Sequence, residues 1–577
     1  MNDMLTVKDD QFMLNGQPFQ ILSGSIHYFR VPQEYWEDRL IKLKNCGFNT
    51  VETYIPWNFH EPKKGQFQFE GMADIEQFIA TAESLGLYII LRPAPYICAE
   101  WEFGGLPAWL LKDRNMALRC ADPNFLKHIE DYYDVLLPKL VPHLITNGGN
   151  VFALQIENEY GAYGNDKQYL ERTREIYKEK GIDVLLFTSD GPDMIEDGSL
   201  PDVLTTLNFG SRVEDSYAML DAYKPNSPKL CAEFWIGWFD SWGKEHHTRD
   251  PKDAAATLRA MLEKDGSVNF YMFHGGTNFA FYNGANQYET YDPTITSYDY
   301  DSLLTESGEI TEKYREVQKV LKEFVTIPEP VEPPTIPILP EQKVQLDRSV
   351  SLFDTLTTIA NHHKNVVPMS MEEMDQAYGY VLYRTTIDRK ADMVMDTSMI
   401  RDRAFLYING EYVQTVYRND EKKEITLSFP EDINTLEIFV ENMGRVNYGK
   451  HLRDRKGIIE NLWIDNQYIF HWEMFSIELE EVVLDFSRAT TERFPQFYEG
   501  TFELAETGDT FINMEGWKKG NVFINGVNLG RYWEIGPQKT LYLPAPFLNV
   551  GENTIQILEL EGTKQQEVHF ANKPDLG

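Results

Sequence analysis

Apolar positions in the first 325 residues follow two alternating patterns. Short runs rich in Val, Ile, Leu and aromatic residues are separated by amphipathic stretches with helical spacing. Strands that alternate with helices in this way form βα units around a parallel sheet. Because no Gly-rich phosphate turn occurs early in the chain, the pattern predicts an α/β fold of the closed (β/α)₈ TIM barrel type rather than an open doubly wound sheet. The expected strands begin at Phe19, Asn49, Tyr88, Val151, Val184, Val203, Lys229 and Val268.

Two of the intervening helical stretches are followed by a candidate glycine stop. YWEDRLIKLKNC precedes Gly47, and DAAATLRAMLEKD precedes Gly266. Glycine readily adopts the left-handed conformation that ends many helices. We therefore expect both helices to end at these glycines.

A proline-rich segment divides the chain into two halves. From Pro328 to Pro340 the sequence reads PEPVEPPTIPILP, which removes backbone donors and fixes φ so often that an extended connector is expected. Beyond it, short alternating strands are broken by Asn-Gly, Pro and Asp, a pattern typical of all-β sandwiches. We predict a barrel over residues 1–327, a linker over 328–344, and two all-β domains over 345–485 and 486–577.

The two predicted β domains share a weak internal repeat. RAFLYINGEYVQTVYR begins at Arg403 and GNVFINGVNLGRYWE begins at Gly520, and both indicate a strand, an Ile-Asn-Gly turn and a second strand. The turns lie about 116 residues apart, which is a domain-sized period. Since Asn-Gly is the preferred pair of a type I′ hairpin, Asn409 and Asn525 are expected in turns rather than in ligand sites.

Composition narrows the classes of function. The formal charge of −36 repels nucleic acid and anionic membranes, so neither is expected as a partner, whereas a neutral sugar substrate is compatible with it. The N-terminal residues show no secretory pattern and no segment reaches about 18 uninterrupted apolar residues, so a cytoplasmic protein is expected. The four scattered cysteines are expected to be reduced and to bind no metal. The oligomeric state is left open, and a homodimer is compatible with the sequence.

Candidate chemistry lies where two of the barrel strands end, because the carboxyl ends of the strands carry the active site in this fold. The fourth predicted strand ends in QIENEYG, which contains Glu157, Asn158 and Glu159, and the seventh ends in CAEFWIGW, which contains Glu233. Two carboxyl groups that meet from different strands match glycoside hydrolysis. One carboxyl group protonates the leaving oxygen, and the other attacks or stabilises the anomeric carbon.

Longer motifs extend this interpretation. They are ETYIPWNFHEP from Glu52, RPAPYICAEWEFGGLPAWLL from Arg92, QIENEYG from Gln155, AEFWIGWFDSWG from Ala232, YMFHGGTNF from Tyr271 and TSYDYDSLLTESG from Thr296. In these motifs and their order, the chain resembles the β-galactosidases of glycoside hydrolase family 35, in particular a bacterial, intracellular, β1,3-galactosidase-like type. The β domains resemble the galactose-binding-like jelly rolls that follow the barrel in this family.

The resemblance implies a role for individual residues. Glu159 would be the acid/base, Glu233 the nucleophile, and Asn158 the ligand of the 2-hydroxyl of galactose. The implied reaction is retaining exo-hydrolysis of terminal β-D-galactose from a galactoside glycan, with a β1,3 linkage to N-acetylglucosamine. No metal or organic cofactor is expected, since a proton and a carboxylate suffice for this chemistry. The other implied substrate-binding residues are Tyr54, Cys98, Ala99, Glu100, Trp235, Trp238, Tyr271 and Tyr300.

Some of these residues also allow a purely structural interpretation. Strict alternation would place Glu157 and Glu159 on one face of the strand and Asn158 on the other, so a bulge or the strand end must intervene if Asn158 and Glu159 both reach substrate. We expect Glu157 to be a buried acid paired with Arg92. Cys98 has no histidine base close to it in the sequence and is expected to pack against the sugar rather than to act as a nucleophile.

Two alternative functions stay open at this point. A retaining β-glycosidase for another sugar, such as glucose, would use the same pair of acids. A sugar-binding protein whose barrel has lost its activity would bind a β-galactoside without turnover. From the size of the β domains and the pattern of the family that the chain resembles, we expect them to pack on the barrel and to shape the entrance of its pocket.

Overall fold

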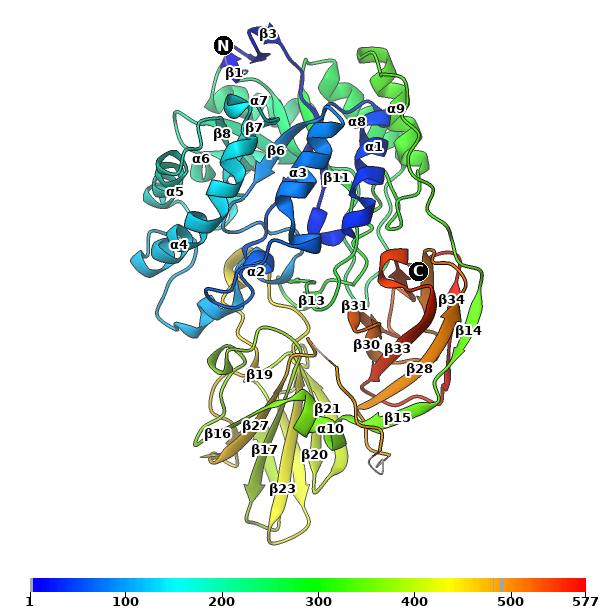
Figure 1. Cartoon of the computed structure of the whole chain (residues 1–577). Coiled ribbons are helices and arrows are strands. Elements are labelled where there is room, and N and C mark those ends of the chain that lie inside the picture. Colours follow the sequence, from blue (N-terminus) through cyan, green and yellow to red (C-terminus); the bar gives the residue numbers. More distant parts are fainter. Residues whose placement is uncertain (1–3, 481, 488–491) are drawn as a thin grey trace.

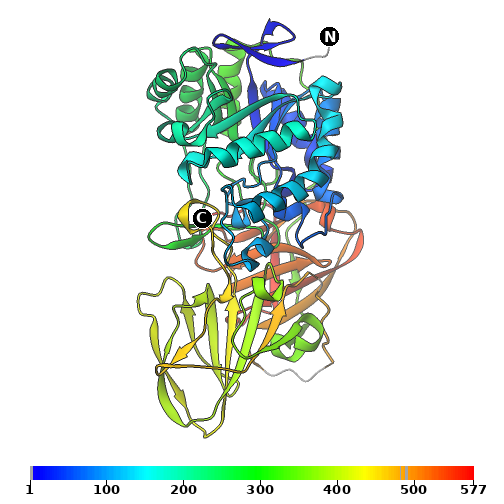
Figure 2. The same ribbon diagram turned by 90° about the vertical axis from the view of Figure 1, so that its left-hand side faces the viewer.

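The computed structural model describes residues 4–480, 482–487 and 492–577. Eight parallel strands close into a barrel that forms the N-terminal half of the chain, coloured blue to green in Figure 1. Two β-sandwiches pack against one end of this barrel, as Figures 1 and 2 show from two sides. A TIM barrel followed by two all-β domains confirms the fold class expected from the sequence.

The barrel strands are almost wholly buried, as expected for a parallel sheet that is covered on both faces. They are β4 (Leu22–Ile26), β5 (Thr50–Tyr54), β6 (Tyr88–Arg92), β7 (Val151–Asn158), β8 (Leu185–Asp190), β9 (Leu204–Phe209), β10 (Leu230–Trp235) and β11 (Ser267–His274). A helix follows each strand, so the eight predicted βα units are confirmed. These helices are α1 (Trp36–Cys46), α3 (Ile75–Ser84), α4 (Pro123–Leu140), α5 (Lys167–Glu179), α6 (Ile195–Gly198), α7 (Val213–Tyr223), α8 (Pro251–Leu262) and α9 (Glu312–Phe324).

The two predicted glycine stops have different outcomes. α1 ends at Cys46, and Gly47 caps it in the left-handed conformation with φ 114°. The prediction at Gly266 is wrong, because α8 ends earlier, at Leu262, and the left-handed residue after it is Asp265. A Cβ atom at Gly266 would lie 2.5 Å from the Tyr217 hydroxyl oxygen, so this glycine permits close packing against α7 rather than a helix cap.

Each β domain is a two-sheet sandwich with its own apolar core. The first pairs the sheet β16-β27-β17-β23-β20-β21 with β22-β18-β25-β26. Its strands are β16 (Asn361–Asn365), β17 (Tyr380–Ile387), β18 (Ala391–Asp396), β20 (Arg403–Ile408), β21 (Glu411–Tyr417), β22 (Glu424–Phe429), β23 (Asn434–Glu441), β25 (Trp463–Ile464), β26 (Gln467–Tyr468) and β27 (Trp472–Ile477).

The second sandwich pairs β15-β28-β33-β30-β31 with β14-β34-β29-β32. Its strands are β14 (Gln342–Gln345), β15 (Arg348–Ser351), β28 (Gln496–Leu504), β29 (Thr510–Asn513), β30 (Lys519–Ile524), β31 (Val527–Trp533), β32 (Thr540–Leu543), β33 (Gly551–Glu559) and β34 (Glu567–Ala571). The internal repeat is therefore structural, since β17-β23-β20-β21 and β28-β33-β30-β31 have equivalent strand orders. Asn409 and Asn525 both have positive φ within two-residue hairpin turns, as predicted.

The strands that directly follow the proline-rich segment belong to the second sandwich. β14 pairs with β34, and β15 pairs with β28, so the chain adds a strand to each sheet of the second sandwich before it builds the first. This pairing differs from the domain boundary expected at residue 345. Alternation of apolar residues reveals a strand but not its partner, so these two pairings could not be predicted from the sequence.

The first sandwich packs on the loops at the carboxyl end of the barrel through buried charges. Arg445 donates to Glu102 of the barrel at 2.6 Å and to Glu372 of its own domain at 2.6 Å, and all three side chains are buried. Nearby, the Tyr96 hydroxyl donates to the backbone oxygen of Asn447 at 2.6 Å. The expectation that the β domains pack on the barrel is confirmed. None of the helices within the described residues is long and apolar enough to cross a membrane.

Candidate active site

A cavity of about 140 Å³ opens at the carboxyl ends of the barrel strands. Every site residue predicted from the sequence lines it, although the predicted roles of these residues are not decided by this placement. The predicted residues in the lining are Tyr54, Cys98, Ala99, Glu100, Asn158, Glu159, Glu233, Trp235, Trp238, Tyr271 and Tyr300. Sequence reasoning missed five further lining residues, which are Ile97, Phe239, Asn286, Tyr288 and Tyr448.

Both candidate glutamates lie next to irregular pairing in their strands. The register of β7 against β8 shifts between Gln155 and Asn158, so of the two possibilities that the sequence pattern left open, a bulge or the strand end, a bulge-like irregularity is present. Glu159 follows directly, in the left-handed conformation with φ 46°. In β10, the register against β9 shifts between Cys231 and Glu233. The irregularity in β7 lets Asn158 and Glu159, which regular alternation would place on opposite faces of the strand, line the same cavity.

The Glu233 carboxylate is held by three donors. Its Oε1 accepts from the Tyr54 hydroxyl at 2.5 Å and from the Arg92 guanidinium at 2.9 Å, and its Oε2 accepts from the Trp235 indole at 3.2 Å. Arg92 is fully buried, so its positive charge acts at short range on this carboxylate. The three donors fix the orientation of the Glu233 carboxylate.

Glu159 occupies a different environment. Burial, reinforced by the negative charge of Glu233, raises the pKa of Glu159 to about 8, and the hydrogen bond from Asn208 opposes this shift. That bond joins the Asn208 amide nitrogen to Glu159 Oε1 at 3.1 Å. A carboxyl group with this pKa carries a proton at neutral pH and can donate it to a leaving group.

Asn158 presents one end of its side chain to the cavity in a fixed orientation. Its Oδ1 accepts from Arg92 at 2.7 Å and lies 3.1 Å from the Tyr54 hydroxyl oxygen, while its Nδ2 donates to the backbone oxygen of Ile97 at 3.3 Å. Because protein donors occupy the oxygen, the amide nitrogen is the end that can donate a further bond to a ligand.

The turn after β6 forms another wall in a strained conformation. Cys98, Ala99 and Glu100 all have positive φ, at 59°, 59° and 47°. The first sandwich braces this turn, since the Asn447 amide nitrogen lies 3.6 Å from Cys98 Sγ. Non-glycine residues in this conformation cost about 1–3 kcal/mol each and persist where surrounding contacts determine them, often at ligand sites. Burial raises the pKa of the Cys98 thiol, which disfavours the reactive thiolate.

Glu100 and two tyrosines form a hydrogen-bonded chain beside this turn. The Tyr298 hydroxyl donates to Glu100 at 2.5 Å, and the hydroxyls of Tyr271 and Tyr298 lie 2.9 Å apart. Burial raises the pKa of Glu100 to about 7. The cavity thus offers aromatic faces together with hydroxyl, amide and carboxyl groups, the combination that a sugar's C–H faces and hydroxyls require.

Comparison with known proteins settles the family. Residues 11–324 match the family described as glycosyl hydrolases family 35. The chain belongs to this family. In the C-terminal half of the chain, residues 368–478 match the first all-β domain of β-galactosidase and residues 495–553 match its galactose-binding domain.

Curated relatives of this family 35 chain align over nearly its full length. β-Galactosidase-1-like protein 2 of Homo sapiens is 40% identical over 590 residues, which cover 99% of this chain and 92% of the relative. β-Galactosidase of Homo sapiens is 41% identical over 612 residues, covering 98% of this chain and 90% of the relative. β-Galactosidase of Mus musculus is 41% identical over 590 residues, covering 96% and 90%.

Glu157 of this family 35 enzyme is buried and paired, but the predicted partner is wrong. Glu157 meets Arg119 at 3.3 Å and accepts from the Tyr169 hydroxyl of α5 at 2.5 Å. Arg92 instead donates to Gln155 at 2.6 Å inside the barrel. The bulge in β7 accounts for the difference, because it directs Glu157 toward α5 while Gln155 faces the barrel interior.

The acidic residues Asp299 and Glu306 of the motif TSYDYDSLLTESG hold the surrounding loop in place through hydrogen bonds. Asp299 accepts from the backbone nitrogens of Asp301 at 3.1 Å and Glu306 at 3.2 Å, which shapes the loop that carries Tyr300. Glu306 accepts from the Thr277 hydroxyl at 2.6 Å, and burial raises its pKa to about 8. Among the residues that the structure describes, no cluster of three or more His, Cys, Asp or Glu side chains could hold a metal ion.

Glu306→Gln should make the free energy of unfolding less dependent on pH. The folded-state pKa of Glu306, about 8, lies above its unfolded value of roughly 4.5, so its stabilising contribution is complete below pH 4.5 and is lost as the pH rises through 8. Glutamine does not ionise and avoids that loss. The free energy of unfolding of the variant, taken relative to the parent, should therefore be higher at pH 9 than at pH 4.5 by on the order of 4 kcal/mol. Urea denaturation at the two values measures it. The exposed Glu309→Gln in the same loop is the matched control, and an equal effect there would contradict the prediction.

Proposed function

We propose that this family 35 enzyme is a retaining exo-β-galactosidase that releases terminal, non-reducing β-D-galactose. The main support is that a carboxyl group protonated at neutral pH, Glu159, and a carboxylate held by three donors, Glu233, line one small cavity. Their two environments match the two roles that retaining hydrolysis needs. The printed names of the curated relatives support galactose as the sugar.

In the first step, Glu233 attacks the anomeric carbon and forms a carbon–oxygen bond to it. The glycosidic bond breaks, and the departing oxygen takes the proton of Glu159. Arg92 and Tyr54 orient Glu233 for this attack through their hydrogen bonds to Oε1. Asn158 would donate to the 2-hydroxyl from its amide nitrogen, a contact that strengthens in the transition state.

In the second step, Glu159 is ionised and removes a proton from water, which attacks the anomeric carbon. The bond to Glu233 breaks, galactose leaves with its original configuration, and both carboxyl groups return to their starting states. The two displacements each invert the carbon, so the net result is retention. Over the two reaction steps one water molecule is consumed, and the proton of Glu159 and the carboxylate of Glu233 are both regenerated.

The size of the cavity supports cleavage at chain ends. A cavity of about 140 Å³ is smaller than the roughly 300–1,000 Å³ of pockets that hold drug-sized ligands, so it suits about one sugar unit. Tyr448 of the first sandwich and Tyr288 line the same cavity from outside the barrel strands. They restrict its entrance, which favours one sugar unit inside and the remainder of the glycan outside.

We also propose the finer assignment to the bacterial, intracellular type that cleaves galactose β1,3-linked to N-acetylglucosamine. The support for a reducing compartment is that all four cysteines are free, with Cys46, Cys98 and Cys231 buried. The support for the linkage is the family resemblance of the motifs alone.

A substrate panel tests the sugar and the linkage together. Nitrophenyl β-galactoside should be hydrolysed with a kcat/KM at least about 10²-fold above that of the β-glucoside, because a pocket built to bind one hydroxyl orientation rejects the epimer. Among disaccharides of galactose on N-acetylglucosamine, the β1,3 isomer should exceed the β1,4 and β1,6 isomers. Comparable rates on glucoside would support a broader β-glycosidase, and tight binding of galactosides without any turnover would support a binding protein.

A further inference from the structure

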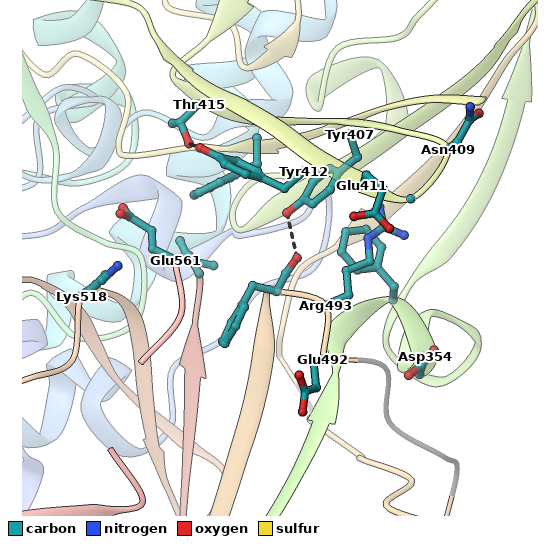
Figure 3. A pocket seen from close by; sticks show the side chains of 15 residues that line it. Asp354, Tyr407, Asn409, Glu411, Tyr412, Thr415, Glu492, Arg493, Lys518 and Glu561 are labelled. Carbon is teal, nitrogen blue, oxygen red and sulfur yellow. Dashed lines mark hydrogen bonds between the residues drawn. The ribbon is translucent and has the colours of Figure 1, made fainter. Parts of the chain in front are cut away.

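A second cavity, of about 760 Å³, lies between the two β-sandwiches and shares no lining residue with the active site. Figure 3 shows the side chains that line it. One wall is the β20–β21 hairpin of the first sandwich, and the opposite wall contains Lys518 and Glu561 of the second. The remaining wall is formed by the start of α10 (Leu352–Ile359) and by residues 492–494.

The floor of this interdomain groove is aromatic and fixed. The rings of Phe353 and Tyr407 meet edge to face with centroids 5.2 Å apart, and the Arg493 guanidinium lies over both, at 3.4 Å and 4.4 Å from their centroids. The Tyr407 hydroxyl donates to the backbone oxygen of Phe494 at 2.8 Å, the dashed line in Figure 3. Because these contacts hold the floor in place, a ligand would meet a preformed surface.

An exposed aromatic ring stands at the edge of the interdomain groove. Tyr412 on the β20–β21 hairpin is 57% exposed, and its ring centroid lies 6.0 Å from that of Tyr407 in the floor. The Tyr412 hydroxyl lies 3.0 Å from that of Thr415, which helps to orient the ring. A large ring held in solvent beside an aromatic floor offers a stacking face to a ligand.

The rim of the interdomain groove supplies mixed polar groups. Glu411, Asn409 and Lys518 line it, and Glu561 is paired with Arg403 at 2.6 Å. Among the described residues, the buried Nε of Arg493 has no hydrogen-bond partner. Hydrogen-bond donors and acceptors, including both acidic and basic side chains, surround the aromatic floor, and this combination suits a neutral molecule with many hydroxyls. The net charge of −36 on the chain would repel a polyanion.

We propose that the interdomain groove is a second, non-catalytic glycan-binding site for a neutral oligosaccharide of β-linked galactose units. Its volume exceeds that of the one-sugar active-site cavity about fivefold, which leaves room for several sugar rings. Bound there, a glycan would keep the enzyme on its substrate between cleavage events. The choice of galactose as the sugar rests on the proposed function, whereas the existence of the site rests on the geometry of the groove.

Calorimetric titration of full-length Glu233→Gln tests this site without cleavage of the ligand. The probe is β1,4-linked galactotetraose, added in the absence and in the presence of saturating galactose. We expect two classes of binding site without galactose and one remaining class when galactose fills the active-site cavity. Tyr412→Ala should weaken the remaining class by about tenfold or more, since it removes the stacking face. Tyr412→Phe keeps the ring and should bind as the parent does.

Tyr468→Ala is the matched control, because Tyr468 is another exposed tyrosine of the first sandwich, at 42%. Thermal melting confirms that each variant is folded. Absence of binding in the presence of saturating galactose, or equal binding by Tyr412→Ala and the parent, would overturn the proposal, as would equal weakening by Tyr468→Ala. Hydrolysis of nitrophenyl β-galactoside by the unaltered chain is measured separately, so that failure of the proposed function and failure of the groove are distinguishable.

Discussion

Glu233→Gln should lower kcat/KM for nitrophenyl β-galactoside by at least about 10⁴-fold while leaving the protein folded. Glutamine preserves the shape of the side chain and its contact with Tyr54, but its amide oxygen cannot form the covalent bond to the anomeric carbon. The side chain is 7% exposed and contacts Arg92, so some change in thermal stability is expected without loss of the fold. Initial rates and a melting curve measured on the same preparation check both parts.

External azide separates a nucleophile from a residue that merely supports the site. In Glu233→Gly, azide can occupy the vacated position and attack with a single inversion, which should give the α-galactosyl azide and restore part of the rate. Asn208→Gly removes a neighbour of Glu159 rather than the proposed nucleophile and should give no such product. A Glu233→Gln enzyme that kept most of its rate, or a Glu233→Gly enzyme that gave only the β product, would rule out this assignment.

The barrel and the two glutamates were predictable because each depends on local sequence. Eight apolar runs separated by amphipathic helices define the barrel without knowledge of distant contacts. Glu159 and Glu233 stand where two of those runs end, and the barrel brings such strand ends to one mouth. Period-two alternation also predicted that a bulge or the strand end must intervene if Asn158 and Glu159 both face the cavity, and the structure has a register shift between Gln155 and Asn158.

The failures depend on contacts between residues that are far apart in the chain. The partner of Arg92 could not be chosen from the sequence, because the bulge decides whether Glu157 faces the barrel interior or α5. Tyr448 lies in another domain, more than 200 residues beyond the motifs that contain Glu159 and Glu233, and no periodicity in the sequence predicts that it lines the cavity. Register and partner choice thus carry information that composition and alternation do not contain.

Glu159→Gln should show a loss of rate that depends on the leaving group. For a galactoside with a poor leaving group, such as a disaccharide, we expect kcat/KM to fall by about 10²–10⁴-fold, because the departing oxygen no longer receives a proton. For dinitrophenyl β-galactoside the departing oxygen needs no proton, so formation of the galactosyl enzyme should continue. Its breakdown lacks the general base, and azide should therefore accelerate turnover and give the β-galactosyl azide.

The pH profile gives an independent test of the same residue. The acid is active only while protonated, and its pKa in the free enzyme is about 8, so kcat/KM of the parent on a disaccharide should hold up to that value and fall above it. Glu159→Gln removes the titrating proton and should remove this alkaline limb. Glu100, whose pKa is about 7, titrates in the same cavity and is the natural competitor for the assignment. If the limb survives in Glu159→Gln but disappears in Glu100→Gln, the proton that reaches the leaving oxygen comes from Glu100, and the acid/base role must move to the turn after β6.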